Sequence, residues 1–135
     1  SAQAANEYMN TILASYSPAN NNMVELIICN NDGMAEGAIS ALVSAGYNKG
    51  TGDGITIPVF GVDATSAARE LIKAGKMAGT IKQDAEGMAD AIEDIIENGL
   101  EGKAILSGMD DYNVDENVAK VRIAYGVYLG ENNGQ

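Results

Sequence analysis

Three polar side chains stand just after apolar stretches of strand length, and a helical pattern follows each of them: Asn31, Asp63 and Gln83. Asp63 offers only acceptor oxygens, whereas Asn31 and Gln83 each offer two donor hydrogens and one acceptor oxygen. This mixture matches neighbouring hydroxyl groups, and the bonds to the carboxylate would be charge-assisted. The chemistry indicated is recognition of a polyhydroxylated ligand such as a sugar. The alternative is that these are the ordinary polar strand ends of a doubly wound domain.

The elements that must position these residues alternate between strands and helices. Apolar runs predict strands over residues 23–29, 55–62 and 77–81, with Pro58 placed at the start of the second strand. Helical spacing of apolar residues follows each strand. Such alternation favours a mostly parallel sheet flanked by helices, with right-handed crossovers. The three polar residues would then share the carboxyl edge of the sheet, where open α/β sheets bind ligands.

Capping residues and breakers bound the expected helices, which cover residues 3–16, 33–45, 65–74 and 84–98. Asp32 is the expected N-cap of the second helix, Thr65 or Ser66 of the third and Asp84 of the fourth. The glycine-rich stretch 46–54 reads as a flexible surface loop, and 110–113 as a turn. Residues 104–106 and 118–129 are expected to add short strands, and the polar tail 131–135 to fray. Five residues should form the buried stripe of the fourth helix: Met88, Ala91, Ile92, Ile95 and Ile96.

Composition narrows the possible functions. The 135 residues, 46% of them apolar, suffice for a folded domain with a real core. A net charge of −11 argues against nucleic acid and anionic membranes as partners. The chain has no histidine, and its one cysteine, Cys29, lies in an apolar strand where a buried, unreactive thiol is expected. With no nucleophile–base pair at suitable spacing, we expect a binding protein and not an enzyme.

Three ordered motifs carry a family resemblance: NNDGMAEGA at 30–38, IPVFGVDA at 57–64 and LIKAGKMAGTI at 71–81. Together they resemble the periplasmic glucose/galactose-binding proteins of sugar ABC transporters, which have ribose-binding proteins as close relatives. The resemblance implies that Asn31 and Asp63 hydrogen-bond sugar hydroxyls. Gln83 stands where galactose-binding members usually carry asparagine and ribose-binding members carry glutamine. The resemblance therefore implies a monosaccharide ligand and leaves its identity open.

A calcium site is also implied by the resemblance. Glu25 matches a glutamate that chelates calcium in the glucose/galactose-binding proteins, together with a loop located earlier in their chain. The alternative reading of Glu25 is a surface carboxylate at a strand edge.

The resemblance further implies a domain organisation. Family members have two lobes joined by three crossing segments, with the sugar between the lobes. Residues 1–83 would be part of the C-terminal lobe, 84–121 would belong to the N-terminal lobe, and 122–135 would return to the C-terminal lobe and form the tail. We therefore expect the chain alone to bind sugar weakly and to self-associate through apolar surfaces that the rest of a receptor would cover.

Function and location follow from the same resemblance. The receptor would close by a hinge around its sugar and deliver it to the membrane permease of an ABC transporter, with a chemoreceptor as a further partner. It would lie in the periplasm or outside the cell, where a lipid anchor can hold it. The alternative is the effector-binding core of a related sugar-responsive transcription repressor, which would carry a basic helix-turn-helix segment upstream.

Overall fold

The computed structural model describes residues 1–50, 52 and 54–130. The expected tail 131–135 and two positions of the expected loop, Thr51 and Asp53, lie outside the described residues. Within these residues the α-helices are α1 (Ala2–Ser15), α2 (Asp32–Ser44), α3 (Ser66–Lys73) and α4 (Ala85–Leu100). The strands are β1 (Ile27–Ile28), β2 (Val59–Val62), β3 (Gly79–Lys82), β4 (Asn113–Asp115), β5 (Lys120–Arg122) and β6 (Gly126–Tyr128). None of the helices in these ranges is long and apolar enough to cross a membrane.

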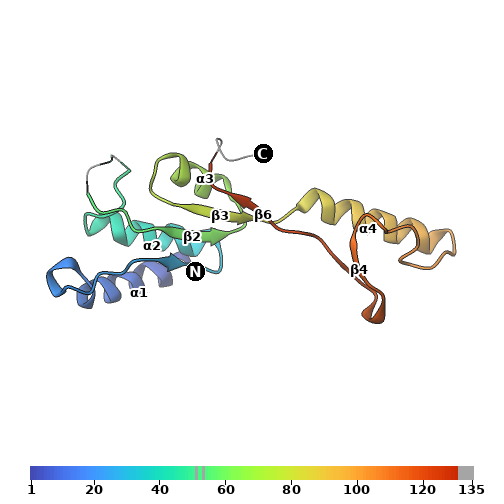
Figure 1. The fold of residues 1–135 in the computed structure, drawn as a ribbon, viewed down its shortest axis with the longest axis horizontal. Coiled ribbons are helices and arrows are strands. Elements are labelled where there is room, and N and C mark those ends of the chain that lie inside the picture. Colours follow the sequence, from blue (N-terminus) through green and yellow to red (C-terminus); the bar gives the residue numbers. More distant parts are fainter. Residues whose placement is uncertain (51, 53, 131–135) are drawn as a thin grey trace. The chain divides into compact units, whose positions relative to one another are not determined.

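A four-stranded sheet has the order β1-β2-β3-β6 (Figure 1). The first three strands are parallel, with Ile27 opposite Val59 and Phe60 opposite Gly79. Helices flank this sheet, so the predicted α/β class with a mainly parallel sheet is confirmed. A separate two-stranded antiparallel ribbon pairs β4 with β5.

The chain divides into two compact units. The first contains Ser1–Lys82 and the chain from Val127 onward, and the second contains Gln83–Gly126.

The core of the first unit lies between the sheet and its helices. Its buried members include Met9, Ala35, Ala38, Ile39, Leu42, Ile57, Val59, Ala68, Ile72 and Met77. Close packing of α1 on α2 depends on Gly37, because a Cβ atom there would collide with the carbonyl oxygen of Ala2. The Asn6 amide donates to the Gly37 carbonyl at 3.1 Å, so the same contact is also hydrogen-bonded.

The regular part of β1 is shorter than the expected strand over 23–29. Pairing to β2 extends slightly beyond it, since the Ile27 N–H donates to the Pro58 carbonyl and the Cys29 N–H to the Phe60 carbonyl, both at 2.9 Å. Pro58 directly precedes β2, as predicted, where its missing N–H costs no ladder bond.

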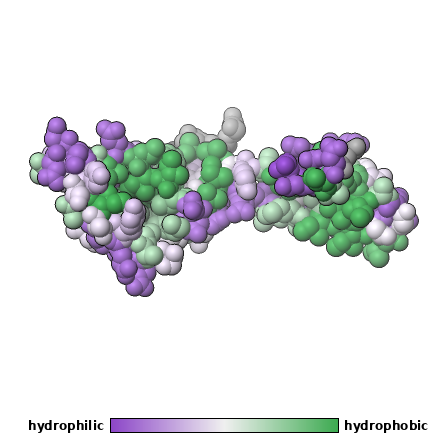
Figure 2. Space-filling view, turned by 90° about the horizontal axis from the view of Figure 1, so that it is seen from below, coloured by the Kyte–Doolittle hydropathy of each residue, from purple (hydrophilic) through white to green (hydrophobic). Residues whose placement is uncertain are grey.

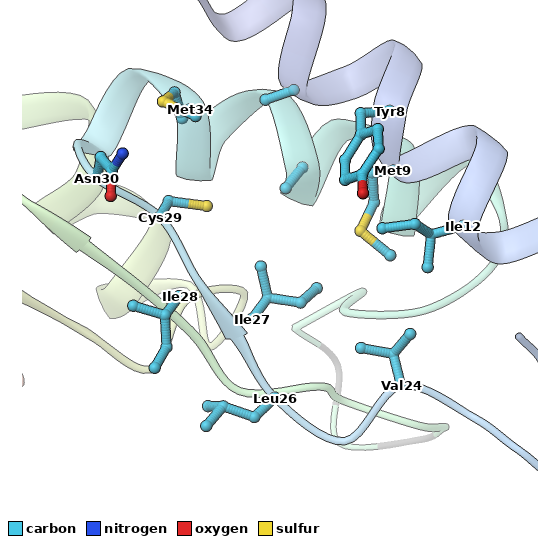
Figure 3. A pocket seen from close by; sticks show the side chains of 12 residues that line it. Tyr8, Met9, Ile12, Val24, Leu26, Ile27, Ile28, Cys29, Asn30 and Met34 are labelled. Carbon is cyan, nitrogen blue, oxygen red and sulfur yellow. The ribbon is translucent and has the colours of Figure 1, made fainter.

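Within the described chain β1 is covered on one face only, whereas apolar strands of parallel sheets are ordinarily covered on both. Figure 3 shows Ile27 and Cys29 on the side of the helices, and Leu26 and Ile28 pointing away. Leu26 is 51% exposed and Ile28 is 75% exposed. Because side chains alternate along a strand, one face enters the core and the other carries apolar surface.

One residue of the glycine-rich stretch after α2, Asn48, is anchored, which differs from the flexible loop expected there. Asn48 is fully buried. Its Nδ2 donates to the carbonyls of Ile57 (2.8 Å) and Lys76 (3.0 Å), and its Oδ1 accepts from the Ile57 N–H (2.8 Å). Its φ of 46° is left-handed, a conformation that asparagine tolerates better than most residues. Asn48 therefore ties this stretch to the segments that lead into β2 and β3.

In the second unit, α4 begins at its predicted cap, where the Asp84 side chain accepts from the Gly87 N–H at 3.2 Å. Of the predicted buried stripe, Ala91 is buried, whereas Met88, Ile92 and Ile96 are 39%, 57% and 55% exposed. Figure 2 shows hydrophobic surface on this unit. The apolar spacing of α4 is thus real, but the described residues of the unit do not cover it.

The end of α4 also differs from the expectation. The helix runs past Asn98 to Leu100, and Asn98 is buried. The Asn98 amide donates to the carbonyls of Ile105 (3.1 Å) and Ser107 (2.8 Å). Residues 105 and 106 lie in a turn and residue 104 in irregular backbone, so the small strand expected over 104–106 is wrong.

Candidate functional site

The candidate site lies at the carboxyl edge of the parallel sheet. Asn31 follows β1 after two intervening residues, and Asp63 directly follows β2. Because β1 and β2 are parallel neighbours, both residues lie at the same edge. Gln83 directly follows β3 and is the first residue of the second unit. Asn31, Asp63 and Gln83 are all exposed, and their role in ligand binding stays a prediction.

Asn31, and not Asp32, is the N-cap of α2. Its Oδ1 accepts from the Met34 N–H at 2.9 Å, and its backbone is extended (φ −154°, ψ 166°). This is the geometry that a capping residue needs. The predicted cap at Asp32 is wrong because that residue is already the first in the helix. The cap uses Oδ1 alone, so the two hydrogens of Nδ2 take no part in it.

Asp32 has a different role, which sequence reasoning missed. Its side chain is fully buried. Oδ1 accepts from the Thr80 hydroxyl at 2.6 Å, and Oδ2 accepts from the Thr65 N–H at 2.8 Å. Asp32 thereby links the start of α2 to β3 and to the N-cap of α3. A Cβ atom on Gly61 would collide with Asp32 Oδ1, so a glycine in β2 leaves room for the carboxylate.

Asp63 has an unusual backbone conformation. Its φ is 115° and that of the next residue, Ala64, is 53°. Left-handed backbone at a non-glycine residue costs of the order of 1–3 kcal/mol and clusters at functional sites. The Asp63 N–H donates to the Ile81 carbonyl at 2.8 Å, and the Ala64 N–H donates to Thr80 Oγ1 at 3.3 Å. The strained turn that presents Asp63 is therefore bonded to β3 on both sides.

The predicted calcium ligand, Glu25, lies just before β1. It is exposed, and residues 1–50, 52 and 54–130 hold no group of three or more potential metal-ligating side chains. A calcium ion takes about six to eight oxygen ligands. One exposed carboxylate does not supply them, so a calcium role for Glu25 stays a prediction.

An apolar groove of about 360 Å³ lies between α1, the β1 segment and α2 (Figure 3). Tyr8, Met9 and Ile12 line it from α1, and Ile27 and Cys29 from the strand. Its lining is too apolar for a polyhydroxylated ligand, so this groove is not the candidate site. The predicted burial of Cys29 is confirmed, and burial raises the pKa of its thiol.

Comparison with known proteins shows the same fold and a related sequence. A family described as periplasmic binding protein domain matches residues 1–104. The D-galactose/methyl-galactoside binding periplasmic protein of Haemophilus influenzae is 38% identical over 87 residues, which are 64% of this chain and 24% of that protein. The chain thus spans about a quarter of this curated relative.

Two solved structures extend the comparison to nearly the whole chain. One is an ABC transporter solute binding protein from Bacillus halodurans with bound myo-inositol, which is 29% identical and has a TM-score of 0.65. The aligned region is 97% of this chain and 37% of that protein. The other is a solute binding protein from Clostridium phytofermentans with bound β-D-glucose, which has a TM-score of 0.66. The aligned region is 96% of this chain and 36% of that protein. At 22% identity the second comparison supports the fold alone.

The family match contains all three motifs of the sequence analysis and extends through Gln83 and α4. The solved structures share the arrangement of helices and strands that places these motifs. The chain therefore belongs to the family of periplasmic binding protein domains.

Proposed function

We propose that this chain is part of the sugar receptor of an ABC transporter, a protein that closes two lobes around a monosaccharide. The observation that carries the proposal is the presentation of Asp63 in a strained turn at the carboxyl edge of a parallel sheet, beside the strand that leads to Asn31. Carboxylate acceptors and amide donors at one edge suit adjacent hydroxyl groups.

The relatives support the class of ligand. The Haemophilus influenzae protein is named for D-galactose and its methyl glycoside, and the Bacillus halodurans protein was solved with myo-inositol. Galactose and inositol are both six-membered rings that carry several hydroxyl groups. We propose a ligand of this kind, bound by Asn31, Asp63 and Gln83. Because Gln83 matches the glutamine of ribose-binding members, ribose-like sugars are also candidate ligands.

Binding, and not catalysis, is the proposed activity. The chain has no histidine, and Cys29 is buried with a raised thiol pKa. The proposed location is the periplasm, in keeping with the family and its named relative. The proposed partner is the membrane permease of the transporter, with a chemoreceptor and a lipid anchor as further elements. The alternative, a repressor effector core, has no support from these relatives.

The domain organisation is proposed on the same basis. Residues 1–83 and 122–135 would belong to one lobe and 84–121 to the other. The exposed apolar side chains of α4 favour this division, because such a surface is typical of a site where another part of a protein packs. The proposed cover is the remainder of a two-lobed receptor, and a second copy of the chain would replace it when the chain is alone.

Calorimetric titration of the full-length protein that carries this chain tests the proposal. D-galactose, D-glucose, D-ribose and myo-inositol are the ligands, and each titration is repeated with EDTA and with Glu25→Gln to test calcium. We expect saturable binding of at least one of these ligands. Absence of saturable heat for all four at millimolar concentration would reject the sugar-receptor proposal.

A further inference from the structure

A hydrogen-bonded network connects three segments at the carboxyl edge of the sheet. Asp32, at the start of α2, accepts from Thr80 of β3 and from the Thr65 N–H. Thr80 Oγ1 also accepts from the Ala64 N–H. We call Asp32, Thr80 and these two backbone N–H groups the Asp32 network. Neither Asp32 nor Thr80 is among the predicted sugar-binding residues.

The direction of each hydrogen bond follows from the groups involved. A hydroxyl has one hydrogen, and at 2.6 Å that hydrogen lies toward the acceptor-only carboxylate of Asp32. The lone pairs of Thr80 Oγ1 are then the acceptors for the Ala64 N–H at 3.3 Å. Asp32 therefore sets the hydroxyl of Thr80 in the orientation that holds the Ala64 amide.

These bonds determine the backbone on both sides of Asp63. The peptide before Asp63 is held because its N–H donates to the Ile81 carbonyl at 2.8 Å. The peptide after Asp63 is held through the Ala64 N–H and Thr80. The next peptide is held at the Thr65 N–H by Asp32 and at the Ala64 carbonyl by Arg69 Nε at 2.9 Å. Three successive peptides are thus fixed around two left-handed residues, which few residues adopt without such support.

We propose that Asp32 and Thr80 are positioning residues of the sugar site: they hold the left-handed turn that aims Asp63 at the ligand. This inference rests on the proposed function. The two residues touch the turn and not the ligand. Preorganisation of this kind raises affinity because the turn does not have to be ordered when the ligand binds.

The Thr80 hydroxyl offers a sharp test. Thr80→Val removes the hydroxyl at nearly constant volume, and Thr80→Ser retains it. The matched control is Asn48→Gly, which removes the three hydrogen bonds of a buried amide to segments that lead into β2 and β3, at the opposite edge of the sheet. All variants are made in the full-length protein and titrated with the ligand that binds best to the wild type.

We expect Thr80→Val to weaken affinity by about tenfold, the equivalent of about 1.4 kcal/mol. Thr80→Ser should keep the affinity within about twofold of the wild type. Asn48→Gly should also keep it within about twofold, although this variant lowers the stability of the fold. Thr80→Val that remains folded and binds like the wild type would overturn the inference. An equal loss of affinity in Asn48→Gly would also overturn it, because instability alone would then explain the effect.

A second measurement needs no sugar. Hydrogen exchange followed by ¹⁵N NMR on the wild type should show protection of the Ala64 and Thr65 amides, and Thr80→Val should lose protection at Ala64 first. Exchange of both wild-type amides at the rate of an unstructured chain would reject the network. If no ligand binds the wild type, the proposed function fails, while this exchange measurement still decides whether the turn is held.

Discussion

Asn48 is the residue whose removal tests the architecture of the first unit most directly. Its buried amide makes three hydrogen bonds of 2.8–3.0 Å to backbone groups of Ile57 and Lys76. Residue 76 is 28 positions away along the chain, so the contact joins the loop after α2 to the entrance of β3. Asn48→Ala deletes all three bonds and leaves a side chain that disfavours the left-handed backbone.

The expected loss of stability is about 4 kcal/mol. Each buried hydrogen bond contributes about 1 kcal/mol net, which gives about 3 kcal/mol for three. Alanine in a left-handed conformation adds about 1 kcal/mol more. Asn48→Gly accepts the backbone conformation and should cost only the first part, about 3 kcal/mol. The difference between these two variants separates the backbone term from the hydrogen bonds.

Urea unfolding followed by circular dichroism measures both variants. The free energy of unfolding falls by about 2 kcal/mol per molar urea, so Asn48→Ala should lower the urea concentration at the unfolding midpoint of the first unit by about 2 M. Asn20→Ala is the control, because it removes one exposed bond, to the Ser15 carbonyl at 3.0 Å. That variant should lose less than about 1 kcal/mol. A midpoint for Asn48→Ala close to that of Asn20→Ala would refute the idea that a buried amide anchors this segment.

Three further predictions concern the site and the second unit. Asp63→Ala in the full-length protein should weaken sugar binding by about 1.5–3 kcal/mol, the range for bonds to charged groups, and calorimetry showing unchanged affinity would remove Asp63 from the site. Cys29, buried and with a raised thiol pKa, should react slowly with a thiol reagent at neutral pH and rapidly in denaturant; rapid stoichiometric labelling of the native chain would contradict this. Burial and the 3.1 Å hydrogen bond to Asp94 raise the pKa of Tyr112, so the fold favours the neutral phenol. The stabilisation by the neutral Tyr112 phenol should be complete below the ordinary tyrosine pKa of about 10 and should vanish as the pH rises through the raised pKa. The difference in unfolding free energy between the wild type and Tyr112→Phe should therefore disappear at high pH, and a difference that does not change with pH would contradict this prediction.

Local signals in the sequence predicted much of this fold correctly. The alternation of apolar runs and helical patterns predicted parallel strands separated by helices, which the structure has. Thr65 and Asp84 cap α3 and α4 as expected, because a cap bonds to an amide only three residues away. The position of Asp63 directly after a strand was visible for the same reason. Such features depend on neighbours along the chain, and composition and spacing record them.

Tertiary structure alone decided which polar residues hold the framework and which are presented at its edge. Asp32 looked like the cap of α2, yet its partner Thr80 lies 48 positions later, and Asn31 takes the cap. Asn48 looked like part of a mobile loop until the chain brought Lys76 against it. The apolar stripe of α4 was visible in the sequence, but whether a neighbour covers it was not. The type of a residue determines which hydrogen bonds its side chain is able to make. Which of these bonds form depends on the distant partners that folding brings close to it.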